Sequence, residues 1–260
     1  MTQLFLHHET HEGEPITLSG EDAHYLAHVL RRAPGDEFTV VTPAGLEAQV
    51  RITAISRTLV EGLVASLGPA RPLPSAHVAL YAALLKPKGW EWLLQKATEV
   101  GAAEIYPLLT EHSVVQPRSE RLAAQVERWN KIAEAAGRQC QSPTVPVVHA
   151  PRELAEALRH WKAQTPQTGA QDMPGLIFEL TVRDQPVAHL RSVLSGLDRP
   201  ARLALFIGPE GGFSEAEFQS GLAAGLHAAS LGPRVLRAET AATVAVALCL
   251  HELSAPGGTA

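Results

Sequence analysis

Three glycines, at positions 208, 211 and 212, lie within five residues directly after an apolar strand pattern. The segment is Leu203-Ala-Leu-Phe-Ile-Gly-Pro-Glu-Gly-Gly-Phe-Ser-Glu-Ala-Glu217. Glycine tolerates positive φ and lets a ligand approach the backbone closely. Ser214 and Glu217 have the spacing of a capping box, so we expect a helix to begin here and to present oriented amide donors. The glycine spacing fits neither the P-loop nor G-x-G-x-x-G. We therefore predict a ligand-binding loop of another kind rather than a tight turn that binds nothing.

A second glycine-bearing loop, Leu231-Gly-Pro-Arg-Val-Leu-Arg-Ala-Glu-Thr240, lies between a short strand pattern and the last apolar helix. Two such loops close together in sequence favour one shared pocket. Arg234, Arg237 and Glu239 add charge there, and charge on loops of this kind is often functional. For Glu239 an equally good explanation is the dipole of the final helix, which favours an acidic residue near its start.

Several cationic residues could hold phosphate groups. Lys86 and Lys88 follow a strand pattern, and His24, Arg31 and Arg32 share one predicted helix of the N-terminal region. Arginine often binds a phosphate backbone in this way. A metal site is the weaker interpretation of the histidines, because neither the pair at 24 and 28 nor the run from 7 to 11 has an evident third ligand. We predict no metal.

The N-terminal region combines one helical pattern, Glu21–Arg32, with strand patterns. The strands are expected over Phe38–Val41, Ala48–Ile55 and Leu59–Leu67, separated by turn signals. A small β-barrel or sandwich is the predicted result. Residues Gly68–Ser75 carry three prolines and no apolar periodicity, which is typical of a linker. We place the boundary near residue 72, with domains 1–72 and 73–260.

Beyond that boundary, short apolar strands alternate with helical patterns. The expected pairs are His77–Leu84 with Trp90–Val100, Ile105–Leu108 with Arg121–Cys140, Val145–Val148 with Glu153–Trp161, Gly175–Phe178 with Val187–Leu194, Leu203–Ile207 with Glu215–Ala223, and Ala228–Ser230 with Ala241–Leu253. This alternation predicts an α/β domain with a mostly parallel sheet. Ligands of such sheets bind beyond the carboxyl ends of the strands, where both glycine loops should lie. Gln164–Pro174 is polar and is expected to be a surface insertion.

The composition is that of a soluble globular protein of one or two domains. The chain has 260 residues, of which 45% are hydrophobic and 19% charged, and its net charge is −5. That charge argues against non-specific coating of nucleic acid, so any RNA contact needs a local patch. The longest apolar runs are too short for a membrane span, and the lack of a cationic, apolar start predicts a cytoplasmic protein without a leader. Cys140 and Cys249 are expected to be buried, reduced thiols.

Together these segments resemble the ribosomal RNA small-subunit methyltransferase E family, which are uridine-N3 methyltransferases of the SPOUT class. The resemblance covers almost the whole chain. Its carriers are His24 with Val29-Leu-Arg31, Pro-Gly-Asp36, Lys96-Ala-Thr-Glu-Val-Gly101, Ile105, Pro107, His112-Ser113, Glu127-Arg-Trp129, Gln139-Cys140, Ile207-Gly-Pro-Glu-Gly-Gly-Phe213 and Leu231-Gly-Pro-Arg-Val-Leu-Arg-Ala-Glu-Thr-Ala241. The last two are the most specific. Family arginines are replaced here by Gln3 (within Met-Thr-Gln3-Leu-Phe5) and by Ser142.

The resemblance implies an N-terminal PUA-like β-barrel that binds RNA, followed by a SPOUT α/β domain with a deep trefoil knot. It also implies a homodimer that binds S-adenosylmethionine in the knotted loops. The implied cofactor-binding residues are Phe178, Glu179, Ile207, Gly208, Gly212, Leu231, Gly232, Val235 and Leu236. RNA contact is expected from His24, Arg31, Arg32, Lys86 and Lys88.

The implied reaction is methylation of N3 of a uridine in small-subunit ribosomal RNA, free or in the assembling subunit. Positioning the two reactants can supply about 7–11 kcal/mol of such a barrier. The N3 proton must also leave, which calls for a base or for a cation that stabilises the uridine anion. We nominate Arg237 as the cation and Glu239 as a weaker candidate for the proton acceptor. The alternatives are methylation of another RNA, such as transfer RNA, and a non-catalytic module for RNA binding or ribosome assembly.

Overall fold

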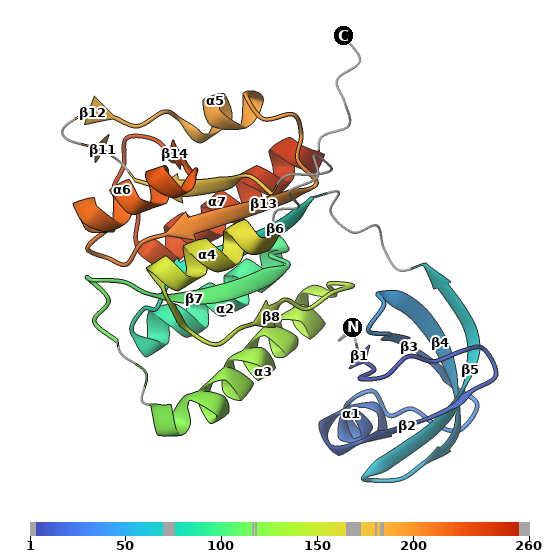
Figure 1. The fold of residues 1–260 in the computed structure, drawn as a ribbon. Coiled ribbons are helices and arrows are strands. Elements are labelled where there is room, and N and C mark those ends of the chain that lie inside the picture. Colours follow the sequence, from blue (N-terminus) through green and yellow to red (C-terminus); the bar gives the residue numbers. More distant parts are fainter. Residues whose placement is uncertain are drawn as a thin grey trace. The chain divides into compact units, whose positions relative to one another are not determined.

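The structure is a computed structural model. It describes residues 4–69, 76–115, 117, 119–164, 173–179, 181–182 and 185–254. The chain divides into two compact units, one of Met1–Leu73 with Gly137–Thr144 and one of Pro74–Ala136 with Val145–Ala260 (Figure 1). The boundary predicted near residue 72 falls within 70–75, outside the described residues. Gln3 also lies outside them.

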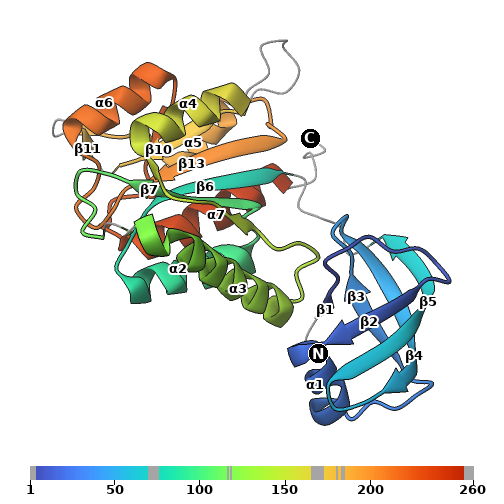
Figure 2. The same cartoon turned by 60° about the horizontal axis from the view of Figure 1, so that its bottom comes forward.

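The first unit is built on a mixed, curled sheet of five strands (Figure 2). The strands are β1 (Leu4–Phe5), β2 (Pro15–Ser19), β3 (Glu37–Val41), β4 (Leu46–Ile55) and β5 (Leu59–Pro69), in the order β1-β3-β4-β5-β2. Among the described residues of this sheet, β1 and β3 are the one parallel pair, and the other neighbouring strands are antiparallel. Side chains along β2 and β5 alternate between buried and exposed, as in a sheet with one face on the core. The sequence patterns predicted β3, β4 and β5 but not β1 or β2.

The helix predicted over Glu21–Arg32 is shorter and irregular. An α-helix, α1 (Gly20–His24), passes directly into a π-helical turn, η1 (Tyr25–Val29). The wider turn is closed by the amide of Leu30, which donates to the carbonyl of Tyr25 at 2.9 Å. Arg31 follows with φ of 50°, in the left-handed region that ends a helix. Periodicity at 3.6 residues carries no signal for such a local widening.

The second unit contains a parallel sheet of seven strands, as the alternating patterns predicted. The strands are β6 (His77–Ala83), β7 (Glu104–Leu109), β8 (Val147–Val148), β9 (Arg152–Glu153), β10 (Gly175–Phe178), β13 (Arg202–Ile207) and β14 (His227–Ala229). Their order is β14-β10-β13-β6-β7-β8, and β9 pairs with β7. A separate two-stranded hairpin, β11 (Thr181–Val182) with β12 (Gln185–Pro186), was not predicted.

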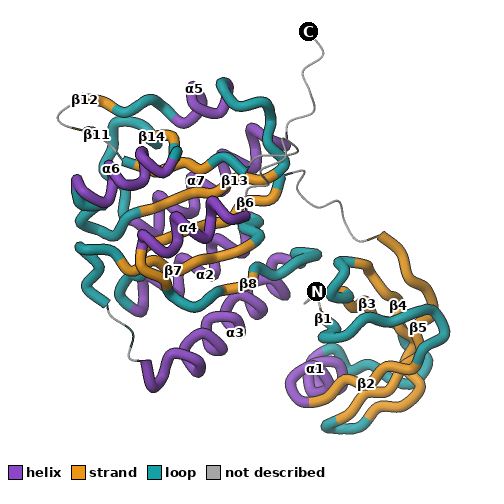
Figure 3. The backbone as a smooth tube through the Cα atoms, viewed as in Figure 1, coloured by secondary structure: helices purple, strands orange, loops and turns teal. Residues whose placement is uncertain are grey.

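Helices cover both faces of this sheet (Figure 3). They are α2 (Pro87–Val100), the short 3-10 turn η2 (Ser119–Arg121), α3 (Leu122–Cys140), α4 (Leu154–Gln164), α5 (Leu190–Ser195), α6 (Glu215–Ala224) and α7 (Ala238–Ser254). On one face, α2, α3, α5 and α7 share a core with β6 and β13. On the other, α4 and α6 pack over Tyr81, Tyr106 and Phe206. The sheet is therefore buried on both sides, which explains why its central strands are continuously apolar.

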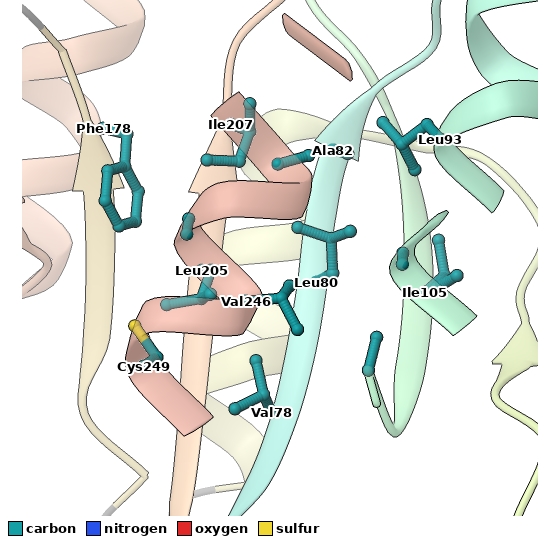
Figure 4. Close-up of a cluster of buried hydrophobic side chains, with 14 of the residues drawn as sticks. Val78, Leu80, Ala82, Leu93, Ile105, Phe178, Leu205, Ile207, Val246 and Cys249 are labelled. Carbon is teal, nitrogen blue, oxygen red and sulfur yellow. The ribbon is translucent and has the colours of Figure 1, made fainter. Parts of the chain in front are cut away.

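Helix α7 supplies part of the larger core. Figure 4 shows Val246 and Cys249 of this helix against Leu80 of β6 and Leu205 of β13. Burial raises the pKa of the Cys249 thiol to about 12, so the thiol stays protonated, as expected for a structural cysteine. Cys140, expected to be buried, is only half-buried, because it is the last residue of α3.

Two predicted segments differ in detail. The helix expected over Val187–Leu194 begins only at Leu190, because the preceding residues form extended backbone beside the chain that follows β14. His189 makes a parallel bridge with Ser230, and the amide of Ser230 donates to the carbonyl of Ala188 at 2.8 Å. Of the expected insertion at 164–174, residues 165–172 lie outside the described residues, whereas Met173 is buried.

An aromatic row crosses the sheet at one level. Phe206, Tyr81 and Tyr106 are register partners on β13, β6 and β7, and His149 follows β8 at the next position. Their rings stack with centroid separations of 4.5, 4.4 and 4.0 Å along the row. The row ends on the carboxylate of Glu104, which accepts hydrogen bonds from Tyr106 Oη at 2.5 Å and, when Nε2 is protonated, from His149 at 2.9 Å.

We expect Glu104 to make stability depend on pH. The hydrogen bond from His149, then that from Tyr106, lowers the pKa of Glu104 to about 2 from a usual value of 4.5, against the opposing effect of burial. A lowered folded-state pKa stabilises the protein above the unfolded value, and this contribution disappears as pH falls from about 4.5 through about 2. Glu104→Gln should therefore cost about 2–3 kcal/mol at pH 7 and much less at pH 3. Urea unfolding of both chains at the two pH values measures this. Equal losses at both would contradict it.

Candidate functional site

A cavity lies where three neighbouring strands end. Strands β14, β10 and β13 are adjacent in the sheet, although they are far apart in sequence, and the chain leaves the carboxyl end of each into a loop. These loops enclose a cavity of about 330 Å³. Its lining residues are Phe178, Glu179, Ile207, Gly208, Pro209, Glu210, Gly211, Gly212, Leu231, Gly232, Arg234, Val235, Leu236, Ala238 and Ala241. The volume falls within the range of about 300–1,000 Å³ typical of small-molecule sites.

The glycine loop after β13 folds tightly on itself. The amide of Gly212 donates to the carbonyl of Pro209 at 2.9 Å, and Gly212 has φ of +72°. A Cβ at Gly208 would lie 3.0 Å from the backbone nitrogen of Phe213, and one at Gly212 would lie 3.2 Å from Glu179 Oε2. The glycines are therefore needed both for conformation and for space.

Helix α6 begins with the predicted capping box, which is confirmed. The amide of Ser214 donates to Glu217 Oε2 at 2.9 Å, and the amide of Glu217 donates to Ser214 Oγ at 3.3 Å. The second carboxylate oxygen of Glu217 accepts from the amide of Glu111, 2.8 Å away, in the loop after β7. One side chain thus caps the helix and joins two loops.

The loop after β7 contains a hydrogen-bonded turn and contacts the glycine loop. Its turn is closed by Thr110 and Ser113, whose hydroxyl oxygens lie 2.8 Å apart, and by the amide of Ser113, which donates to the carbonyl of Thr110 at 3.0 Å. Within this turn, His112 places its Nδ1 3.1 Å from the carbonyl oxygen of Gly212. The His112 ring also lies against Gly211.

The second glycine loop, after β14, forms the opposite side of the cavity. Its start is fixed by Ser230, whose hydroxyl donates to the carbonyl of Val187 at 3.2 Å. Gly232 has φ of +107°, a conformation that favours glycine. Val235 is 86% exposed, although it borders the cavity, so an apolar side chain stands at the rim.

Comparison with known proteins identifies the family. The RNA methyltransferase domain family matches residues 71–250, and the RNA methyltransferase PUA domain family matches residues 18–64. The chain is 30% identical over 252 residues to the ribosomal RNA small subunit methyltransferase E of Bacillus subtilis, covering 93% of this chain and 91% of that protein. This chain belongs to the ribosomal RNA small subunit methyltransferase E family.

Other similar proteins agree in sequence and fold. The Synechocystis protein is 33% identical over 232 residues, covering 89% of this chain and 71% of that one. The methyltransferase E of Neisseria gonorrhoeae, solved bound to S-adenosylmethionine, is 25% identical with a TM-score of 0.82 and covers 97% of this chain and 98% of its own. A protein of Legionella pneumophila described as a putative methyltransferase, solved with the same cofactor, is 28% identical with a TM-score of 0.81; the match covers 96% of this chain and 97% of that one.

The structure brings together all nine residues that the resemblance to the methyltransferase E family implied for the cofactor. They come from three segments and line the one cavity described above. Glu210 and Arg234 also line the cavity and carry opposite charges. The sequence reasoning noted Arg234 as a loop charge without giving it a cofactor role, and it did not nominate Glu210. It also did not nominate His112, whose contact with the glycine loop joins segments a hundred residues apart.

The two residues that we nominated for catalysis, Arg237 and Glu239, do not line the cavity. Arg237 stands between the lining residues Leu236 and Ala238, and its side chain is exposed. Among the described residues, its guanidinium has no ion-pair partner. Glu239 is half-buried, and its Oε2 lies 3.9 Å from a Cβ built at Gly89, in the first turn of α2. A carboxylate at that place is favoured by the dipole of α2.

The residues nominated for RNA contact are distributed over both units. Lys86 and Lys88 are exposed at the start of α2, directly after the carboxyl end of β6. In the first unit, His24 and Arg31 are exposed, and the His24 ring lies 4.6 Å from that of His28. Arg32 is half-buried, with a buried Nε that has no hydrogen-bond partner.

Two negative findings concern the described part of the chain. Within it, no cluster of three or more histidine, cysteine, aspartate or glutamate side chains is arranged to hold a metal ion. No helix there has the length and apolar character required to cross a membrane.

Proposed function

We propose that this chain methylates N3 of a uridine in small-subunit ribosomal RNA, with S-adenosylmethionine as the methyl donor. The observation that carries the proposal is the cavity at the carboxyl ends of β10, β13 and β14, which is lined by every residue expected to bind the cofactor. Membership of the methyltransferase E family supports it, as do the relatives solved with that cofactor. We also propose the SPOUT knot, the barrel closure of the first unit and a cytoplasmic location on the basis of the family alone.

The chemistry of the cavity fits such a cofactor. The apolar side chains of Phe178, Ile207 and Leu236 can hold an adenine ring, and the backbones of the glycine loops offer amides and carbonyls at close range. Glu179 and Glu210 supply negative charge for a ligand that carries an ammonium and a sulfonium group. When bound, the cofactor supplies an activated methyl group, which N3 receives while the electron pair of the broken C–S bond stays on sulfur.

Arg237 is proposed to act on the RNA. Because the residues on both sides of Arg237 line the cavity and its own side chain is exposed, a base placed at the cavity mouth lies within reach of the guanidinium. A fixed cation stabilises the negative charge that develops when uridine loses its N3 proton. The target base must be unpaired or extruded, because N3 is occupied in a duplex.

One experiment tests the proposed reaction. Purified protein is incubated with labelled S-adenosylmethionine and either assembled small subunits, free small-subunit RNA or transfer RNA, and the digested nucleosides are identified. We expect 3-methyluridine from small-subunit RNA. Label in transfer RNA alone would show that the protein is a methyltransferase of another RNA. Cofactor retention without any methylated nucleoside would favour a non-catalytic module for RNA binding or ribosome assembly.

RNA contact by the first unit should appear in the salt dependence of binding. We expect the Arg31→Ala, Arg32→Ala double variant to lower the slope of log affinity against log salt by roughly one for each phosphate group that it no longer binds. Arg57→Ala, which removes an exposed arginine from a turn of the same unit, is the control and should leave the slope unchanged. Equal slopes for all three chains would mean that Arg31 and Arg32 do not contact phosphate groups.

Self-association is the remaining expectation from the family. Trp92 on α2 and Leu248 on α7 are large apolar side chains that are 40% and 39% exposed, on two helices that pack together. Apolar surface of this kind is typical of subunit interfaces. We expect light scattering to give twice the chain mass of 27.8 kDa. A monomer that still methylates RNA would refute the homodimer.

A further inference from the structure

We propose that His112 is the proton acceptor of the reaction, through its Nε2 atom. This inference rests on the proposed function, because a base is needed only when the nitrogen that receives the methyl group carries a proton. His112 lies in the loop after β7, and β7 is separated from β13 in the sheet only by β6. The loop therefore belongs to the same carboxyl edge as the cavity.

The loop holds His112 in a fixed position. On one side, the turn from Thr110 to Ser113 is closed by hydrogen bonds within itself. On the other, the amide of Glu111 is held at 2.8 Å by Glu217, which also caps α6. A base must keep within hydrogen-bond reach of the proton that it removes, so a rigid mounting favours this role.

The contact with Gly212 fixes which nitrogen carries the proton. A carbonyl oxygen can only accept a hydrogen bond, and it lies 3.1 Å from His112 Nδ1. The Nδ1 atom must therefore be the donor. In a neutral imidazole the other nitrogen then carries the lone pair. Because the side chain is exposed, this Nε2 lone pair is open to an incoming RNA base.

The His112 ring lies against two residues that line the cavity. Gly211 and Gly212 both line the cavity, and the His112 ring contacts both of them. In the proposed step the N3–H proton passes to Nε2, and the electron pair of that bond remains on N3 to form the bond to the methyl carbon. The imidazolium then releases its proton to water.

Other acceptors near the cavity are less suitable. Glu179 and Glu210 line it, but an ordinary carboxylate is a weaker base than an imidazole. The carboxylate of Glu239 lies close to the first turn of α2, where the helix dipole already gives it a structural role. Proton transfer leaves the backbone contact of His112 in place, because Nδ1 remains a donor to the Gly212 carbonyl after Nε2 is protonated.

Two substitutions separate proton transfer from loop positioning. In His112→Asn the side-chain amide can still donate from near the Nδ1 position to the Gly212 carbonyl, but no base remains at Nε2. We expect its cofactor affinity, measured by calorimetry, to stay within about threefold of wild type. Its single-turnover rate at saturating cofactor and RNA should fall about a hundredfold or more, the usual contribution of a general base. His112→Ala should show the same fall in rate and, in addition, bind the cofactor several-fold more weakly, because its side chain no longer holds the glycine loop.

The tautomer is measured directly. Long-range 1H–15N NMR of labelled protein, with His112→Asn assigning the signal, should show Nδ1 protonated and Nε2 bare in neutral His112. His227→Asn, an exposed histidine on β14, is the matched control and should alter neither rate nor affinity. A His112→Asn chain that methylates at close to the wild-type rate, or a proton on Nε2, overturns the proposal. So does rate loss in Glu239→Gln with none in His112→Asn. If the wild-type chain forms no 3-methyluridine, the proposed function itself is wrong, and this inference fails with it.

Discussion

Gly212→Val is expected to abolish S-adenosylmethionine binding while the protein stays folded. Gly212 has φ of +72°, which a β-branched residue adopts only at considerable cost, and a Cβ there would lie 3.2 Å from Glu179 Oε2. The loop must then change conformation, and both Gly212 and Glu179 line the cavity. Calorimetry should show affinity at least about a hundredfold weaker, equivalent to about 2.7 kcal/mol.

The control for Gly212 is Gly225→Val. Gly225 has φ of +99° at the end of α6, so the substitution imposes a similar backbone strain away from the cavity. It should lower the free energy of unfolding by about 1–3 kcal/mol yet leave cofactor affinity near that of wild type. If the folded Gly212→Val chain binds the cofactor normally, the glycine loop does not belong to the cofactor site.

Arg237→Ala is expected to lose methylation but to keep the cofactor. The exposed guanidinium has no ion-pair partner among the described residues, so its removal should cost little stability. If it stabilises the uridine anion, single-turnover methylation should fall by about 10²–10³, as with the loss of an oxyanion donor. Quench-flow with saturating RNA and cofactor measures this rate, and calorimetry measures cofactor affinity.

Two further arginines make this result interpretable. Arg234→Ala removes a cation that lines the cavity and can pair with the carboxylate of the cofactor, so it should weaken cofactor binding more than the chemical step. Arg159→Ala removes an exposed arginine of α4 and should change neither. If Arg237→Ala methylates at close to the wild-type rate, Arg237 is not a catalytic residue. A joint loss of thermal stability and cofactor affinity would make Arg237 a structural residue instead.

Local sequence patterns predicted the features that depend on neighbours along the chain. The capping box of Ser214 and Glu217 formed as expected, because its two partners are three residues apart and need no distant contact. Strand β10 has the predicted bounds, Gly175–Phe178, because a short apolar run between turn signals is typical of a buried strand. Helix α2 begins three residues earlier than predicted, at Pro87, a residue well suited to the first helical position.

Sequence patterns failed where tertiary contacts outweighed local preference. Residues 187–189, expected to begin a helix, are extended because their backbone pairs with Ser230, some forty positions away. Strand β1 is only two residues long, and it is a strand because it pairs with β3. The π-helical turn after α1 has no periodic signature that distinguishes it from a regular helix.

For the cavity, local sequence patterns predicted the two glycine loops, and contacts between distant segments set how these loops meet. Glycine at 208, 212 and 232 is a local requirement, so these loops could be recognised from composition and spacing. The strand order that makes β14, β10 and β13 neighbours is not sequential, and only that order closes one cavity from three distant loops. The contact of His112 with Gly212 spans a hundred residues and depends on the same sheet. Pairing over such distances is set by the summed burial of all strands and helices, which no single segment encodes.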